Sequence, residues 1–162
     1  MKIKGFSKTF WILIMMLIIF GIIFWSVGGS RVVDEAPYYL KSVIGEASKV
    51  VINNQEFGVE LARTERARLK GLSKRDYLAP DKGMLFIFDE PGIYSFTMKD
   101  TSISLDIIWI LEDEITYIKS RAMPGEEIIT PNNNANYVLE VRPGNASVGG
   151  WKVGDKVEIN LD

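Results

Sequence analysis

The most regular feature of the hydrophobic pattern is an apolar segment, Phe10–Val27, which only Gly21 and Ser26 interrupt. A helix of this length rises ~27 Å, close to the hydrocarbon thickness of a bilayer. Trp11 and Trp25 lie near its two ends, where membrane helices concentrate aromatic side chains. We therefore expect residues 10–27 to form a transmembrane anchor.

The charges on either side of this segment predict its orientation. Three lysines and no acid precede it, whereas Asp34 and Glu35 follow it. By the positive-inside rule, residues 1–9 are predicted to be cytoplasmic and the main domain extracytoplasmic, in a single-pass protein of the cell membrane. The alternative is a signal peptide cut within residues 26–30, which would give a secreted protein. The apolar run is longer than the ~7–15 residues of a signal peptide, and this favours the anchor.

The polar remainder of the chain divides into a stalk and a domain. Residues 28–48 contain Gly-Gly-Ser and Pro37 without a clear period, which is typical of a linker. From residue 49 onward, short apolar or alternating runs are separated by turn residues, and this predicts strands. The expected strands are 49–52, 55–62, 84–88, 93–98, 105–111, 115–122, 137–142 and 156–161.

Turn and capping residues refine this interpretation. Asn53-Asn54 predicts a hairpin turn, because asparagine tolerates positive φ. Thr64 as N-cap and Gly71 as C-terminal residue predict one short helix, and 74–78 indicates a second helical turn. The strand 84–88 is expected to pair with 93–98. The prediction is a mostly β (β-rich α+β) fold, a compact antiparallel barrel-like domain over residues 49–162 with a short helical insert.

Composition removes whole classes of chemistry. The chain has no cysteine and no histidine, which excludes disulfides, thiolate nucleophiles, zinc sites built from these residues and Ser-His-Asp catalysis. Beyond residue 30, 16 Lys and Arg stand against 21 Asp and Glu. An acidic domain repels phosphate backbones, so we expect no nucleic-acid partner. No metal or cofactor is expected, and Glu112-Asp113-Glu114 lacks the spacing of a calcium loop.

One candidate site joins two predicted strands. Lys99 ends one strand and Asp106 lies near the start of the next, so both are expected at one rim beside Thr101. A lysine next to a carboxylate can bind an anionic or hydroxylated ligand, or perform acid–base chemistry if its pKa is shifted. The favoured alternative is an ion pair that fixes the hairpin, because such pairs are common.

Further candidate residues surround the predicted helix and the strand at 137–142. Arg66, Arg68 and Arg75 could form an anion site, since arginine presents forked donors. Alternatively, they cover the domain as a solvated face or pair with Glu65 and Asp76. Glu140 is a candidate ligand-binding carboxylate. It shares a strand face with Arg142, which is most simply interpreted as a surface pair.

The order of several motifs extends these inferences. They are RARLKGLSKR at 66–75, GMLFIF at 83–88, FTMKDT at 96–101 followed by Leu105-Asp106, YVLEV at 137–141 and VGDKV at 153–157. This order resembles the domain-of-unknown-function 192 family, small uncharacterised prokaryotic proteins that are often exported or membrane-anchored. The resemblance implies a β-rich, barrel-like fold and no particular activity. The chain departs from the family where many members have proline, at Ser104, and cysteine, in 130–134, so no role of that cysteine carries over.

The sequence favours a membrane-anchored extracytoplasmic domain that is a non-catalytic binding or accessory module of the cell envelope. Its surface around Lys99, Asp106 and the loop 123–136 would recognise a wall component, another small ligand or an envelope protein. The alternative is a hydrolase-like envelope enzyme that uses Asp106 and Glu140 with Lys99. A structural partner of a membrane complex is the third hypothesis.

Overall fold

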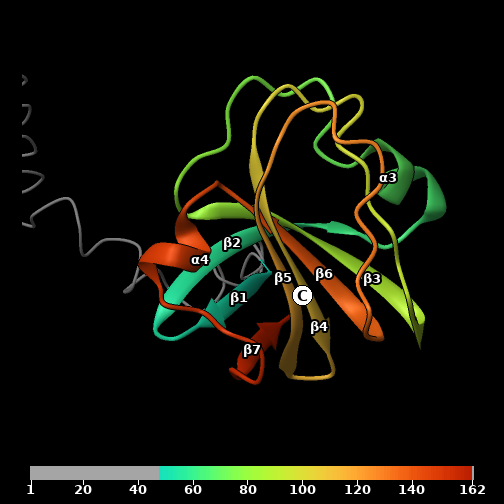
Figure 1. Ribbon diagram of the computed structural model, residues 1–162. Helices are drawn as coiled ribbons and strands as arrows, with labels where there is room; N and C mark the ends of the chain where they lie inside the picture. Colours follow the sequence, from blue (N-terminus) through green and yellow to red (C-terminus); the bar gives the residue numbers. More distant parts are fainter. Residues whose placement is uncertain (1–47, 162) are drawn as a thin grey trace, which may run out of the picture. The chain divides into compact units, whose positions relative to one another are not determined.

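The computed structural model describes residues 48–161, which form one sheet of seven strands and two short helices (Figure 1). The predicted anchor 10–27 and nearly all of the predicted stalk lie outside the described residues. Within 48–161, no helix has the length and apolar character needed to cross a membrane. The elements are β1 (Lys49–Ile52), β2 (Gln55–Ala62), α3 (Glu65–Lys70), β3 (Lys82–Gly92), β4 (Leu105–Leu111), β5 (Glu114–Ala122), β6 (Ala135–Val141), α4 (Asn145–Val148) and β7 (Val157–Asn160).

The strand order in the sheet is β5-β4-β6-β3-β2-β1-β7. Every neighbouring pair is antiparallel except β2 and β3, which are parallel because the chain crosses over between them through α3. The predicted mostly β fold is confirmed. The expected antiparallel barrel is corrected to a mixed half-barrel, since this crossover makes one pair parallel.

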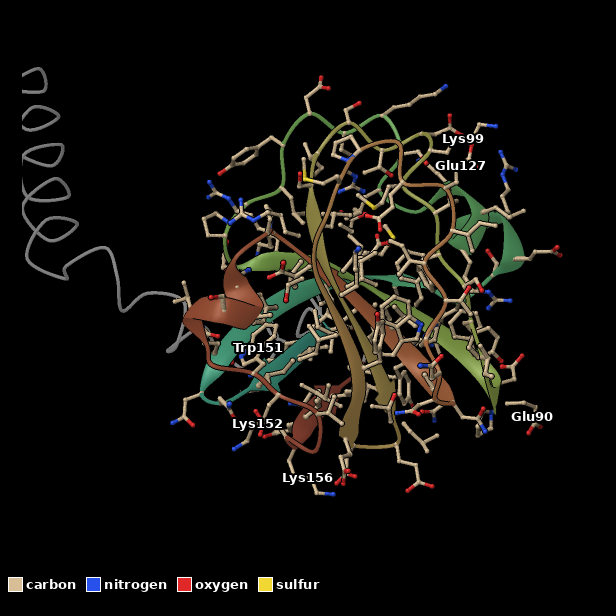
Figure 2. The ribbon with its side chains drawn as sticks, viewed as in Figure 1. Glu90, Lys99, Glu127, Trp151, Lys152 and Lys156 are labelled. Carbon is tan, nitrogen blue, oxygen red and sulfur yellow. The ribbon has the colours of Figure 1, made fainter. Side chains whose placement is uncertain are left out.

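The two edge strands, β5 and β7, meet at one end of the sheet. The Ile115 amide donates to the Asp155 carbonyl at 3.0 Å, and the Val157 amide donates to the Asp113 carbonyl at 2.8 Å. Lys156 lies at this end and pairs with Asp113 at 3.0 Å (Figure 2). Asp113 and Glu114 therefore belong to an exposed turn with a lysine partner.

Two hairpins follow from the turn residues. Asn53 and Asn54 have φ of 47° and 66° and connect β1 to β2, which confirms the predicted turn. Glu112 has φ of 56° at the turn between β4 and β5. Local chemistry is sufficient to fix both hairpins.

The predicted strand 93–98 is wrong as a member of the sheet. Over residues 83–86 both edges of β3 are occupied, by β2 on one side and β6 on the other, so no edge is left there for a hairpin partner. Instead, Phe96 forms an isolated bridge with Ile129 in a distant loop. The predicted helical turn at 74–78 is irregular, and the four-residue α4 was not predicted.

The sheet carries an apolar core on each face. Alternate residues of β4 and β6 point to opposite sides: Ile107 and Val138 to one core, Ile108 and Leu139 to the other. Residues 105–110 are buried throughout, which fits their sequence, LDIIWI, because it is apolar except at Asp106. The first core is covered by connecting segments, whereas the second is covered by β1, β7 and α4 residues such as Ala146.

Candidate functional site

Helix α3 forms one wall of a pocket, and local sequence fixes its two ends. The Thr64 hydroxyl accepts a hydrogen bond from the Ala67 amide at 3.2 Å, as predicted for an N-cap. Gly71 ends the helix with φ of 47°, and its amide donates to the Ala67 carbonyl. A Cβ at Gly71 would lie 3.4 Å from the Phe86 ring. Glycine therefore lets the helix end directly against β3.

Arg68 connects helix α3 to β3 by a hydrogen bond and by a contact with an aromatic ring. Its Nη1 donates to the carbonyl oxygens of Arg63 at 2.7 Å and Ile87 at 2.9 Å. The guanidinium lies 5.0 Å from the centre of the Phe88 ring, which in turn stacks on Tyr94 with the centroids 3.5 Å apart. The sequence allowed Arg68 to be part of an anion site; in the structure its Nη1 bonds to two backbone carbonyls and its guanidinium lies over Phe88.

The segment 94–101 forms the opposite wall. The Phe96 amide and carbonyl exchange hydrogen bonds with those of Ile129, at 2.9 and 2.8 Å. The Trp109 indole donates to the Tyr94 carbonyl at 2.8 Å. The Phe96 ring meets the rings of Phe86 and Trp109 edge to face, with centroids 4.9 and 5.6 Å apart. These contacts hold the aromatic wall in place although the segment is not a sheet strand.

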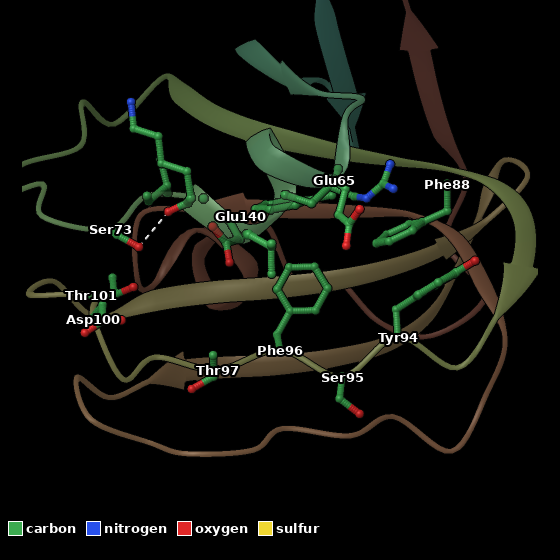
Figure 3. A pocket seen from close by; sticks show the side chains of 16 residues that line it. Glu65, Ser73, Phe88, Tyr94, Ser95, Phe96, Thr97, Asp100, Thr101 and Glu140 are labelled. Carbon is green, nitrogen blue, oxygen red and sulfur yellow. Dashed lines mark hydrogen bonds between the residues drawn. The ribbon is translucent and has the colours of Figure 1, made fainter.

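Between these walls lies a cavity of about 280 Å³ (Figure 3), close to the lower limit of roughly 300–1,000 Å³ for small-ligand pockets. Its lining combines aromatic rings, hydroxyls and charged groups. The aromatic residues are Phe86, Phe88, Tyr94 and Phe96; the hydroxyl residues are Ser73, Ser95, Thr97 and Thr101; the charged residues are Glu65, Arg68, Lys70, Asp100 and Glu140. Figure 3 shows the Glu140 carboxyl in the middle of this set.

Glu140 is the one residue that β6 contributes to the cavity. Its side chain is 5% exposed, and its register partners are Met84 on β3 and Ile107 on β4, both apolar. Burial raises the pKa of Glu140 to about 8. No hydrogen bond or ion pair from residues 48–161 offsets this burial. The carboxyl is therefore mostly protonated at neutral pH, and can both donate and accept a hydrogen bond.

Asp106 is also fully buried, but it does not reach the cavity. Its Oδ1 accepts from the Arg121 amide at 2.8 Å, and its Oδ2 accepts from the amides of Gly144 and Ala146, both at 2.9 Å. Arg121 has φ of 51° at a register shift between β4 and β5. Asp106 thus fixes this bulge and the start of α4, and its side chain leaves the sheet on the face opposite to Glu140.

The structure separates the residues of the first predicted site. Thr101 is buried and lines the cavity. Lys99 is exposed at the outside of the domain (Figure 2), and in the described part of the chain it forms no ion pair with Asp106. The expected rim that joins Lys99 to Asp106 is not formed, because Asp106 is turned inward by its three backbone donors.

The predicted arginine cluster is not brought together either. Arg75 Nη1 and Nη2 donate to the two carboxylate oxygens of Glu60 at 2.6 and 2.7 Å. These hydrogen bonds, together with the charge of the guanidinium, hold the pKa of Glu60 below its usual range. Arg66 is exposed on α3 and does not line the cavity. Arg75 therefore forms an ion pair with Glu60 on β2, and not with Glu65 or Asp76 as the alternative expected.

Sequence reasoning misplaced Glu140 and missed the aromatic wall. The surface pair of Glu140 with Arg142 is contradicted by the burial of Glu140. A signal for the wall was present: Phe86 and Phe88 are two residues apart, as are Tyr94 and Phe96, so each pair lies on one side of an extended segment.

Residues 48–159 match the family model DUF192, described as "Uncharacterized ACR". A protein of unknown function from Novosphingobium aromaticivorans DSM 12444 is 36% identical, with a TM-score of 0.64 over 68% of this chain and 82% of that one. A protein from Sinorhizobium meliloti 1021, described provisionally as a transcription regulator, is 33% identical, with a TM-score of 0.65 over 69% and 91%. No curated protein matches the chain.

Proposed function

The chain belongs to the DUF192 family, whose description names no activity, and we propose from the cavity that it is a non-catalytic binding module of the cell envelope. The ligand is a small molecule held between α3, β3 and the segment 94–101. The observation that carries this proposal is the Glu140 carboxyl, which is buried, lacks a partner among the described residues and opens onto a cavity of ligand size.

Retention of this carboxyl has an energetic cost. With its pKa raised to about 8, Glu140 destabilises the fold at pH 7 by roughly 3 kcal/mol relative to a carboxyl with an ordinary pKa. An apolar side chain of similar size would remove this cost. Departures of this kind from the rules of stable folding concentrate at functional sites. A ligand that hydrogen-bonds to Glu140 would supply the hydrogen-bond partner that residues 48–161 do not provide.

The proposal includes a location. We place the N-terminus in the cytoplasm, residues 10–27 in the cell membrane and the module outside, because lysines precede and acids follow the apolar run. The partner is then a wall component, another small ligand or an envelope protein. Protease added to intact spheroplasts tests this arrangement. Digestion of the module supports the location, and full protection until lysis rejects it.

A thermal-shift screen on the full chain in detergent tests the binding function. A true ligand raises the stability by RT ln(1 + [L]/Kd), about 2.7 kcal/mol at 100 times Kd. We expect this shift in the wild type and in Glu127→Gln, an exposed control, and its loss in Glu140→Leu. An equal shift in Glu140→Leu would place the ligand elsewhere.

The enzyme alternative survives only in altered form. Asp106 cannot act together with Glu140, because the two carboxyls are on opposite faces of the sheet. Glu140 by itself fits a general acid, since its raised pKa keeps the proton at neutral pH. Asp100 and Glu65 are the other carboxylates of the cavity. Hydrolysis of a chromogenic glycoside that disappears in Glu140→Gln would favour this alternative.

A further inference from the structure

The charges that line the cavity restrict the class of ligand. Two acids, Glu65 and Asp100, stand against two bases, Arg68 and Lys70. With Glu140 protonated, the lining carries no net formal charge. Arg68 uses its Nη1 donors on two backbone carbonyls, and the acids of the lining balance its charge. A neutral ligand therefore leaves the filled cavity without a net charge, whereas a charged ligand would introduce one.

Two polar side chains of the cavity lack a hydrogen-bond partner among the described residues. Glu140 is 5% exposed and Thr101 is 9% exposed, and no hydrogen bond to either side-chain oxygen comes from residues 48–161. Buried polar groups are normally paired, because an unmade hydrogen bond leaves their desolvation uncompensated. Both side chains line the same cavity. They form a donor and acceptor set aimed at one bound molecule.

One further hydroxyl keeps capacity for a ligand. Ser73 donates to the Lys70 carbonyl at 2.6 Å, which leaves its lone pairs free to accept. Ser95 instead points away from the cavity (Figure 3) and bonds to Thr130 at 2.9 Å. The ring of Phe96 also lines the cavity, and two edge-to-face contacts hold it in place. Hydroxyls next to an aromatic surface suit a molecule that has polar edges and an apolar face.

Resting on the proposed binding function, we propose that the cavity takes a neutral, polyhydroxylated ligand of the saccharide class. Its hydroxyls bond to Glu140 and Thr101, and its apolar face lies against the aromatic wall of β3 and the segment 94–101. Glu140 donates its carboxylic proton to a ligand hydroxyl and accepts through its carbonyl oxygen. Ionisation of Glu140 removes the donor, so high pH weakens binding.

A cationic ligand predicts the opposite pH dependence. It would pair with an ionised Glu140, and at pH 7 it would first have to displace the proton, which weakens binding about tenfold. Its affinity would therefore rise with pH until Glu140 is fully ionised. The sign of the pH dependence separates the two classes of ligand without any assumption about the identity of the natural molecule.

The charged and titratable groups around Glu140 come from two elements. Helix α3 contributes Glu65, Arg68 and Lys70, and the segment 94–101 contributes Tyr94 and Asp100. The neighbouring strands β3 and β4 present apolar register partners. Glu140→Gln removes the Glu140 proton and leaves these five groups unchanged. The amide also copies a protonated carboxyl, because it has both a donor and an acceptor.

The experiment is calorimetric titration of the full chain in detergent between about pH 6 and pH 9.5. The neutral probes are glucose, mannose and N-acetylglucosamine; choline is the cationic probe. We expect a neutral sugar to bind the wild type with constant affinity below about pH 8 and about tenfold more weakly for each pH unit above it. Glu140→Gln keeps the affinity and loses the pH dependence. Thr101→Val weakens binding, and Glu127→Gln behaves as the wild type.

Results that contradict the proposal separate two claims, the saccharide class of the ligand and the binding function itself. Binding of choline that strengthens with pH and disappears in Glu140→Gln overturns the saccharide class but leaves a binding module. Sugar binding that is indifferent to pH and to Thr101→Val overturns the assigned site. The absence of binding by every probe overturns the saccharide class. If the wider thermal-shift screen also gives no hit, the binding function fails as well.

Discussion

Asp106 and Glu140 lie one register position apart on neighbouring strands, yet their carboxyls leave the sheet on opposite faces. Asp106 pairs with Val141, and Glu140 pairs with Ile107. They are the two carboxyl side chains that are buried among residues 48–161. Asp106 has three backbone donors, whereas Glu140 has none from the described part of the chain. The fold therefore satisfies one carboxyl, and the other is available to the ligand that we propose.

Replacement of Asp106 is expected to damage the fold. In Asp106→Asn, an amide N–H₂ takes the place of an acceptor and faces the backbone amides of Gly144 and Ala146 or that of Arg121. Hydrogen bonds to a charged acceptor contribute about 1.5–3 kcal/mol each, so we expect the free energy of unfolding to fall by about 2–4 kcal/mol. Urea denaturation followed by tryptophan fluorescence measures the loss. The exposed control Asp89→Asn should change stability by less than about 0.5 kcal/mol, and an equally small loss for Asp106→Asn would contradict the structural role.

Glu140 makes stability fall as pH rises. Its pKa is about 8 in the folded state, against 4.5 for a free carboxyl, so the unfolded chain binds fewer protons between these two pH values. The free energy of unfolding then decreases by up to about 1.4 kcal/mol per pH unit in this window and levels off above it. Glu140→Gln removes this slope. Relative to the wild type it should gain roughly 3 kcal/mol between pH 5 and pH 7.5 in denaturation curves; parallel curves for the two proteins would rule the shifted carboxyl out.

The ion pair of Glu60 with Arg75 has the opposite pH dependence. Because the folded state lowers the pKa of Glu60, its stabilisation is present above the ordinary carboxyl pKa and is lost as pH falls through the folded value. Both side chains are partly exposed, at 58% and 32%, so solvent screening keeps the effect small. A double-mutant cycle of Glu60→Gln and Arg75→Gln should give a coupling of about 0.5–1 kcal/mol at pH 7 and almost none near pH 3. A coupling that is unchanged in acid would be incompatible with this pair.

Arg68 should be more sensitive than its neighbour Arg66, although both lie on α3. In the wild type, Nη1 of Arg68 bonds to the carbonyls of Arg63 and Ile87. A lysine at this position would have to reach both with one flexible ammonium, and it has no flat guanidinium to cover Phe88. We expect Arg68→Lys to lower the free energy of unfolding by about 1–2 kcal/mol and to weaken ligand binding, because the helical wall of the cavity loosens. Arg66→Lys is the matched control on the exposed face and should leave both measurements unchanged. Equal effects of the two substitutions would argue against a special role for Arg68.

Sequence was sufficient for the parts of the fold that local chemistry determines. The turn at Asn53-Asn54, the cap at Thr64 and the central strand 105–111 all carry their signals within a few residues. The parallel pairing of β2 with β3 depends on how the chain crosses over between them. For the same reason, alternation at 93–98 indicated an extended segment without showing that β3 had no free edge for it.

The candidate site escaped prediction for a related reason. In YVLEV, Tyr137, Leu139 and Val141 pack on one core, and the interpretation of Glu140 as half of a surface pair placed it on the other face, in water. Connecting segments far along the chain cover the face that carries Glu140. Asp106 is an acid in an apolar run, but one of its partners, Gly144, lies 38 residues away. The acids themselves are visible in the sequence, whereas the burial of Glu140 and the partners of Asp106 are not.

The walls of the cavity belong mainly to connections rather than to strands. The stretch 65–73 and the segment 94–101 supply 13 of its 16 lining residues, and the sheet supplies only Phe86, Phe88 and Glu140. Neither connection belongs to the ladder of the half-barrel, so substitutions at positions of these connections that do not contact β3 leave the ladder untouched. Under the proposed binding function, such substitutions would change which molecule is recognised, and proteins with the same sheet would then differ in their ligands.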